Sequence, residues 1–378
     1  MPALDRSAVH ARLLAIDHAL CAHGRDVALF LVYDRPSRAT ERPGLARTYF
    51  AERCVSDTQL DQMLDTFRTI GAYGELLEGE QAFMTALTTG HIQRVGRPLS
   101  VVYNGIGWGI GVEGFEPGRK GLVPAVADSY QLLCTGSDAY VSALTQHKFH
   151  SFLVLRALGI RTPRVWQYNI PGGWVGKRPS PGLAIIVKST YEAWSVGVTQ
   201  ESVFVVDSSC EARVAAIARD IGQAVTVQEF IPGAEFSVPV ISCPEHHVLP
   251  PMRQTLRRAP GDANAFTTVE DSLQRGAVSF APLEDAPSLL KELQQSALRI
   301  YTVLQMRALG RIDFRVDELG RPWVTDVAIE PGWSTTSSAF ASFAALGVDY
   351  ASFLRMTVGV TLAWAGVLPL ADAGHSRT

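Results

Sequence analysis

The sequence lacks an excess of basic residues: 34 Lys and Arg stand against 37 Asp and Glu, for a net charge of -3 at pH 7. Proteins that bind nucleic acid over a broad surface need a positive field. The sequence also lacks any run of about 18 apolar residues, the length that a membrane-spanning helix requires. We therefore expect no nucleic-acid partner and no membrane span. The most apolar segment, Phe353–Leu370, is interpreted as a buried terminal helix and its tail.

Cysteine is scarce and scattered. The five cysteines include no Cys-x-x-Cys pair, which favours free thiols in a reducing compartment over a disulfide framework or a zinc site. The N-terminus has no basic region followed by an apolar one, so we expect no signal peptide and a cytoplasmic location. The glycines at 105, 107, 109 and 111 do not form the G-x-G-x-x-G of a dinucleotide site.

Hydrophobic periodicity predicts an α/β architecture. Apolar spacing near 3.6 indicates a helix over 8–23, whereas Val27–Tyr33 and Leu99–Asn104 are continuous apolar runs, typical of buried parallel strands. Residues 164–240 are rich in strand patterns, with one helix at Cys210–Ile221. The stretch 251–280 is polar and poorly periodic, and we interpret it as a long, mobile loop over a site. Strands alternating with helices imply layered α/β structure.

The run Ile185–Gly197, IIVKSTYEAWSVG, carries the first chemical signal. Its apolar strand delivers Lys188 to a turn that contains Ser195. A lysine in this position suits the α- and β-phosphates of a nucleotide, and backbone N–H groups of the turn can bind phosphate as well. The alternative is a strand-end lysine that extends to solvent. The turn favours the phosphate interpretation.

The second signal is Gly310–Gly332, GRIDFRVDELGRPWVTDVAIEPG. Two strand-like runs present Asp313 and Asp326 across a hairpin turn at Asp317–Arg321, so both carboxylates can share a face and hold Mg²⁺. The alternative is one structural aspartate on each strand. Arg311 shares the face of Asp313 because side chains alternate along a strand. It can stabilise an oxyanion or bind a substrate carboxylate, or simply pair with one of these acids.

Two further segments complete the candidate site. Gln228–Ile231 follows a strand pattern and Glu235 comes shortly after, an arrangement that suits an adenine edge and ribose hydroxyls. An ordinary sheet edge with surface acids is equally compatible with the spacing. Pro331–Ser338 opens a helix with hydroxyls and free N–H groups, which can bind an anion. Simple capping of the helix by Ser or Thr is the alternative.

Taken together, these motifs resemble those of the ATP-grasp superfamily, in its D-alanine–D-alanine ligase-like branch. The resemblance runs from about residue 99 to residue 360. It is carried by 101–163, IIVKSTYEAWSVGV, VQEFIPGAEFSV and the RIDF…VTDVAIEPG run, in that order. It implies an ATP-grasp fold of mixed α/β class, with an N-terminal Rossmann-like domain at 1–144, a small lid subdomain at 145–240 and a large subdomain at 241–378. A homodimer is also possible by analogy.

The resemblance also implies roles for individual residues. Lys148 and Lys188 would contact ATP phosphates, with Glu192 among the nucleotide-binding residues. Gln228, Glu229 and Ile231 would lie along the adenine, and Glu235 would meet the ribose. Asp313 and Asp326 would bind Mg²⁺. Arg311, the N–H of Gly332 and Ser195 would serve catalysis, Ser337 would grip a substrate carboxylate, and Trp194 and Trp333 could line a substrate pocket.

Departures from the family pattern bear on the substrate. Ala328 replaces the usual asparagine metal ligand, with Glu330 a possible substitute, and Asp326 stands where glutamate is usual. Trp194 replaces a serine, and the Gly-Ser-Glu signature after the first strand is missing. The mobile loop offers no lysine for the γ-phosphate, although Arg257 or Arg258 could serve. We therefore expect an ATP-dependent carboxylate–amine ligase with amino-acid-like substrates, working through an acyl phosphate in specialised metabolism. The alternatives are phosphorylation of a non-carboxylate acceptor, or nucleotide binding without catalysis.

Overall fold

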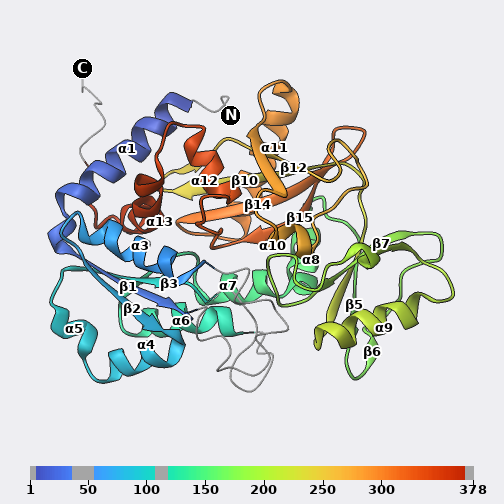
Figure 1. The fold of residues 1–378 in the computed structure, drawn as a ribbon, viewed down its shortest axis with the longest axis horizontal. Helices are drawn as coiled ribbons and strands as arrows, with labels where there is room; N and C mark the ends of the chain where they lie inside the picture. Colours follow the sequence, from blue (N-terminus) through green and yellow to red (C-terminus); the bar gives the residue numbers. More distant parts are fainter. Residues whose placement is uncertain (1–5, 36–54, 107–117, 371–378) are drawn as a thin grey trace.

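The computed structural model describes residues 6–35, 55–106 and 118–370. Its N-terminal layer is a parallel sheet with the strand order β2-β1-β3-β4, at the lower left of Figure 1. The strands are β1 (Val27–Tyr33), β2 (Tyr73–Glu78), β3 (Leu99–Asn104) and β4 (Leu133–Cys134). All seven residues of β1 are buried, as the continuous apolar run predicts for a strand covered on both faces.

Helices pack around this sheet: α1 (Arg6–Ala22), α3 (Asp57–Arg68), α4 (Gly79–Thr88), α5 (His91–Val95) and α6 (Arg119–Ser129). The C-terminal helix α13 (Tyr350–Trp364) joins them and packs against α1. There the buried Asp17 accepts hydrogen bonds of 2.6 and 2.7 Å from Arg355. This confirms the predicted buried terminal helix. Within the described ranges, no helix is long and apolar enough to span a membrane.

A small antiparallel sheet follows, at the right of Figure 1. Helices α7 (Ala139–Gln146) and α8 (Lys148–Ala157) lead into it. Its strand order is β6-β5-β9-β7-β8. The strands are β5 (Val165–Asn169), β6 (Gly173–Trp174), β7 (Ala184–Ser189), β8 (Val203–Val205) and β9 (Val225–Glu229), and the predicted helix, α9 (Cys210–Ile221), packs on β5 and β7. Val187 and Val227 lie at the centre of its separate apolar core.

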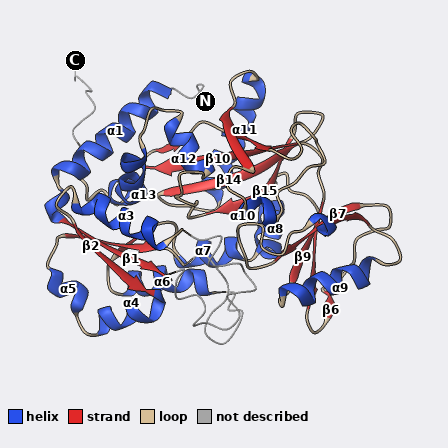
Figure 2. Ribbon diagram, viewed as in Figure 1, coloured by secondary structure: helices blue, strands red, loops and turns tan. Residues whose placement is uncertain are grey.

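The large antiparallel sheet has the order β13-β12-β10-β14-β15, with β11 paired to β10 (Figure 2). Its strands are β10 (Ala234–Ser242), β11 (His246–Val248), β12 (Met252–Leu256), β13 (Val278–Pro282), β14 (Leu309–Val316) and β15 (Pro322–Ala328). Its helices are α10 (Val269–Leu273), α11 (Pro287–Val303) and α12 (Ser338–Ala344). Strand β10 lies wholly in this sheet, so residue 240, the predicted domain boundary, falls inside a strand. The division into domains stays a prediction.

The interpretation of 251–280 as a loop was wrong. Strands β12 and β13 pair in register from Met252–Pro282 to Leu256–Val278, and α10 lies between them. The centre of β12 is polar because Gln254 donates hydrogen bonds to Glu235 and Thr267, which hides the apolar alternation expected of a strand. The remaining predictions of architecture agree with one parallel and two antiparallel sheets.

Candidate active site

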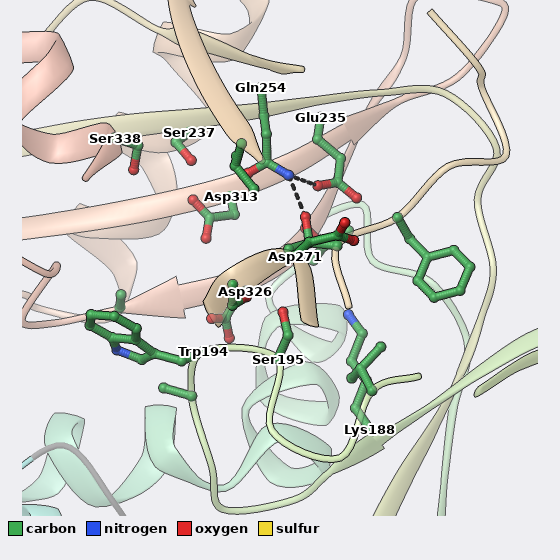
Figure 3. A pocket seen from close by; sticks show the side chains of 18 of the residues that line it. Lys188, Trp194, Ser195, Glu235, Ser237, Gln254, Asp271, Asp313, Asp326 and Ser338 are labelled. Atoms are coloured by element: carbon green, nitrogen blue, oxygen red, sulfur yellow. Dashed lines mark hydrogen bonds between the residues drawn. The ribbon is translucent and has the colours of Figure 1, made fainter. Parts of the chain in front are cut away.

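A cavity of about 390 Å³ lies where the small and large sheets meet (Figure 3). Its walls come from β7 and β9 on one side and from β10, β14 and β15 on the other. Among the predicted site residues, all line it except Trp333 and the two arginines suggested for the γ-phosphate, Arg257 and Arg258. Trp333 is instead buried, with its ring edge-on to those of Tyr33 and Tyr103. The geometry therefore gives no support to a substrate contact by Trp333.

The two predicted metal-binding carboxylates face each other across one ladder. Asp313 on β14 pairs directly with Asp326 on β15, next to a one-residue irregularity between Asp313 and Phe314. Arg311 donates two hydrogen bonds of 2.8 Å to the carboxylate of Asp313. The ion pair that the sequence left open as an alternative for Arg311 is therefore present, and it holds the guanidinium inside the cavity.

The chemistry of these ligands fits a hard divalent cation. Two carboxylates on adjacent strands offer oxygen atoms of the kind that Mg²⁺ prefers, and both line the cavity. The third family position is Ala328, which pairs with Arg311 and offers no side-chain oxygen. In the part of the chain that the structure describes, no group of three His, Cys, Asp or Glu residues is placed to hold a metal. Asp313 and Asp326 therefore stay the candidate carboxylate ligands for a cation.

Two lysines supply positive charge to the same cavity. Burial lowers the pKa of Lys188 to about 8, an effect that Asp326 and Glu235 oppose and that Lys148 and Arg315 reinforce. Its ammonium points from the end of β7 into the cavity in Figure 3. Lys148 opens α8, and its ammonium donates a hydrogen bond to the carbonyl of Glu192. Both cations are placed to meet an anion bound between the sheets.

The segment between β7 and the short turn at Gln200–Ser202 crosses the cavity mouth. Trp194 and Ser195 both have left-handed backbone conformations, with φ of 61° and 56°. Such conformations cost free energy in residues other than glycine and are common at ligand sites. The indole of Trp194 lies against Gly332, where a Cβ atom would approach the ring to 3.2 Å. A glycine at 332 therefore leaves room for the indole and keeps the backbone accessible.

The segment at the end of β9 presents polar groups to the cavity. The amide nitrogen of Gln228 is buried and has no hydrogen-bond partner among the described residues. A buried donor without a partner is costly, so it suits a bound acceptor such as a purine nitrogen. The carboxylate of Glu229 turns instead to Arg164, which donates two hydrogen bonds of 3.0 Å. Glu229 can therefore contribute its backbone, but its carboxylate is already engaged.

Glu235 is held by a polar network on the large sheet. Arg315 donates a 2.8 Å hydrogen bond to one carboxylate oxygen, and Gln254 donates a 2.5 Å bond to the other. Burial raises the pKa of Glu235, and Arg315 and Lys188 oppose the rise. Arg315 also donates to the carbonyls of Gly233, Ala263 and Ala265. This network fixes the carboxylate at the cavity wall, in a position that suits a pair of hydroxyl groups.

Lys120 and Glu330, which the sequence did not predict to lie near each other, also line this cavity. Lys120 reaches the cavity from α6 of the N-terminal layer, and Glu330 reaches it just beyond β15. Burial lowers the pKa of Lys120, and the carboxylates of Glu330 and Asp326 oppose this. Burial raises the pKa of Glu330, against the effects of Lys120 and of the Asn104 side chain. The only sequence signal for Lys120 was a charged residue in an apolar helix.

Ser337 and the arginines of 251–280 have local partners that bear on their predicted roles. The Ser337 hydroxyl accepts a 3.1 Å hydrogen bond from the N–H of Phe340, so it caps α12 while lining the cavity. Arg258 donates to Asp271 and to the carbonyl of Phe266, which commits its guanidinium to the wall of the site. Arg275 lines the cavity, is exposed and follows α10. It is a better placed cation than Arg258 for a terminal phosphate.

Comparisons with known proteins point to one family. A family model described as "D-ala D-ala ligase C-terminus" matches residues 178–358. A D-alanine–D-alanine ligase of Synechococcus sp. (strain JA-2-3B'a(2-13)) is 28% identical over 63% of this chain and 70% of its own length. That of Aromatoleum aromaticum is 30% identical over 62% of this chain and 72% of its own length.

The structural comparison extends over more of the chain. The crystal structure of D-alanine–D-alanine ligase from Bacillus anthracis, complexed with ATP, matches with a TM-score of 0.60 and 16% identity. The match covers 89% of this chain and 97% of that one. It includes the N-terminal layer, where the sequence resemblance is weakest, and it confirms the predicted fold class.

Proposed function

Because the chain belongs to the D-alanine–D-alanine ligase family of ATP-grasp enzymes, which form C–N bonds, we propose that it joins the carboxylate of one amino-acid-like substrate to the amine of another. ATP and Mg²⁺ are the cofactors of this reaction. The observation that carries the proposal is that Lys188 and the facing pair Asp313 and Asp326 line one cavity between two sheets. A cation suited to phosphate and two carboxylates suited to a metal ion thus line the same cavity, which supports the proposal.

The nucleotide would lie between the small and large sheets. Lys148 and Lys188 would hold its phosphates, with Glu192 and the backbone of the Trp194–Ser195 turn beside them. The end of β9, from Gln228 through Glu229 to Ile231, would follow the adenine, and Glu235 would accept hydrogen bonds from the ribose hydroxyls. Asp313 and Asp326 would hold Mg²⁺, which when bound neutralises phosphate charge.

The reaction would then proceed in two steps. A carboxylate oxygen of the first substrate attacks the γ-phosphorus, the bond to ADP breaks, and an acyl phosphate forms. The neutral amine of the second substrate attacks the carbonyl carbon, and phosphate departs with the bridging oxygen while the nitrogen loses a proton. Arg311 and the N–H of Gly332 would stabilise the oxyanion, and Ser337 would bind a substrate carboxylate.

The substrate is proposed to be other than D-alanine, in a specialised pathway. Trp194 supports this, since its large ring lies over Gly332, beside the position where the acyl group would react. A wide apolar ring favours contact with an apolar or aromatic side chain over a methyl group. A reducing cytoplasmic location fits the free cysteines among the described residues, and a homodimer stays a prediction.

A screen of amino-acid pairs for ADP release, with mass spectrometry of the products, tests the proposal. We expect ADP release that depends on both an amino acid and an amine, together with a product whose mass is the sum of the two less one water. ADP release with a phosphorylated acceptor would instead support a kinase-like reaction. Nucleotide binding without turnover on any acceptor would support a protein that has lost catalysis.

A further inference from the structure

We propose that the ammonium of Lys120 takes the place of a second divalent cation, so that the protein binds its nucleotide with one metal ion rather than two. The inference rests on the proposed function, because it concerns the same nucleotide site. Two features of the site support it. Ala328 has no side-chain oxygen to bind a metal ion, and the buried ammonium of Lys120 reaches the cavity from the N-terminal layer.

The first feature is the composition of the metal-binding strand. Asp326, Ala328 and Glu330 occupy alternate positions, and all three line the cavity. The middle one has only a methyl group. A second Mg²⁺ needs several oxygen ligands in near-octahedral geometry. Asp313 and Asp326 can share one ion, but Ala328, at the end of β15, leaves a second ion without a ligand between Asp326 and Glu330.

The second feature is the environment of Lys120. Lys120 is only 9% exposed, yet it lines the cavity. No ion pair within 4.0 Å involves its ammonium anywhere in the described ranges, although its backbone N–H and C=O both form hydrogen bonds. A buried lysine is rarely left without a partner. Asp326 and Glu330 are the carboxylates that act on it electrostatically, so it faces the acidic end of the site.

The carboxylate of Glu330, the possible substitute ligand, packs in part against the N-terminal layer. Its Oε1 atom is buried without a hydrogen-bond partner in the described structure. That oxygen packs against the N-terminal layer, where a Cβ atom on Gly136 would lie 2.9 Å from it. The carboxyl group therefore packs against Gly136, and it acts on Lys120 electrostatically from more than 4.0 Å away. Lys120 supplies positive charge next to Asp326 without any need for an octahedral ligand set, and it disfavours a second dication at the same place.

The test is the number of Mn²⁺ ions retained per nucleotide. The full-length protein is dialysed to equilibrium against Mn²⁺ and the non-hydrolysable analogue AMP-PNP, and protein-bound Mn²⁺ and nucleotide are both measured. We expect one Mn²⁺ per bound nucleotide in the wild-type protein. The double variant Lys120→Met, Ala328→Asn, which removes the ammonium and restores an oxygen ligand, should retain two. Lys120→Arg with Ala328→Asn is the matched control and should retain one, because it keeps the charge.

The outcomes separate the two proposals. Two Mn²⁺ per nucleotide in the wild-type protein would overturn the inference and leave the proposed function standing. A count of one in the Met/Asn variant, with nucleotide binding intact, would also overturn it. Failure of the wild-type protein to retain AMP-PNP would overturn the proposed function itself, and the inference with it. Because two Mn²⁺ per nucleotide in the wild-type protein would already overturn the inference, it can be contradicted even if a variant folds poorly.

Discussion

Asp313 and Asp326 stand directly opposite each other on adjacent antiparallel strands, and Arg311 holds the first of them with two hydrogen bonds of 2.8 Å. This arrangement brings two negative charges together and places a fixed positive charge beside them. Arg311 offsets one of the two negative charges, and a bound cation would offset the other. The Asp313–Asp326 pair therefore fits a role in a nucleotide site better than a purely structural role in the sheet.

Substitution of the first carboxylate should abolish most activity without unfolding the protein. Asp313→Asn keeps the shape of the side chain but weakens a metal ligand, so turnover should fall on the order of 100-fold or more, which corresponds to several kcal/mol of lost stabilisation. Steady-state ADP release measures this loss, and circular dichroism checks the fold. Glu318→Gln, an exposed acid of the same hairpin, is the control and should keep full activity. Equal losses in both variants would show that the metal assignment is wrong.

Nucleotide affinity should depend on pH through Lys188. Its pKa is lowered to about 8, so the ammonium that pairs with phosphate is lost as the pH rises through that value. Affinity for AMP-PNP should therefore be full below about pH 8 and should fall above it. Calorimetric titrations at pH 7 and pH 9 measure the change. In the Lys188→Arg variant the guanidinium stays charged at pH 7 and at pH 9. The affinity of this variant for AMP-PNP should therefore be nearly the same at the two pH values. A wild-type affinity that also stays constant would contradict the assignment.

Trp194 should control the choice of amino-acid substrate rather than the use of ATP. Its side chain is 41% exposed, so Trp194→Ser should cost little stability. We expect changed relative kcat/KM values across amino acids, with the KM for ATP nearly unchanged. The exposed aromatic Tyr140, changed to Ser, is the control and should alter neither property. If Trp194→Ser raises the KM for ATP alone, the indole contacts the nucleotide and not the substrate.

The polar network around Glu235 should matter for stability as well as for binding. Arg315→Met removes the buried partner of that carboxylate, and breaking a buried pair typically costs about 3–5 kcal/mol. Urea unfolding should show a loss of this order. The control is Arg321→Met in the same hairpin, where a half-exposed guanidinium bonds to Asp317 and the expected cost is below about 1 kcal/mol. Similar losses in the two variants would indicate that Arg315 contributes no more than a surface residue.

Much of the site could be predicted because its elements are local. Alternation along a strand places Arg311 beside Asp313, and a short hairpin then brings Asp326 opposite, so two runs of sequence define the pair. The position of Lys188 follows from a single apolar strand. For the same reason the buried strands β1 and β3 were predicted correctly from uninterrupted apolar residues.

The features of the site that could not be predicted from the sequence depend on contacts between segments that are distant in the chain. Lys120 comes from a helix of the N-terminal layer, and no local pattern shows that it reaches a cavity built on β15. Trp333 was predicted to line the substrate pocket, but its ring packs against Tyr33 and Tyr103 of the N-terminal layer, whereas the neighbouring Gly332 lines the cavity. In 251–280, the hydrogen bonds of Gln254 across the sheet make a polar strand stable, and sequence alone shows only its polarity.

Isotope transfer tests the central claim, that a carboxylate is activated by phosphorylation. The donor amino acid identified by the pair screen is labelled with ¹⁸O in both carboxylate oxygens and turned over with ATP and the amine. The account predicts one ¹⁸O atom in each released phosphate and one retained in the amide product. Unlabelled phosphate, or a stable phosphorylated product in place of an amide, would contradict it.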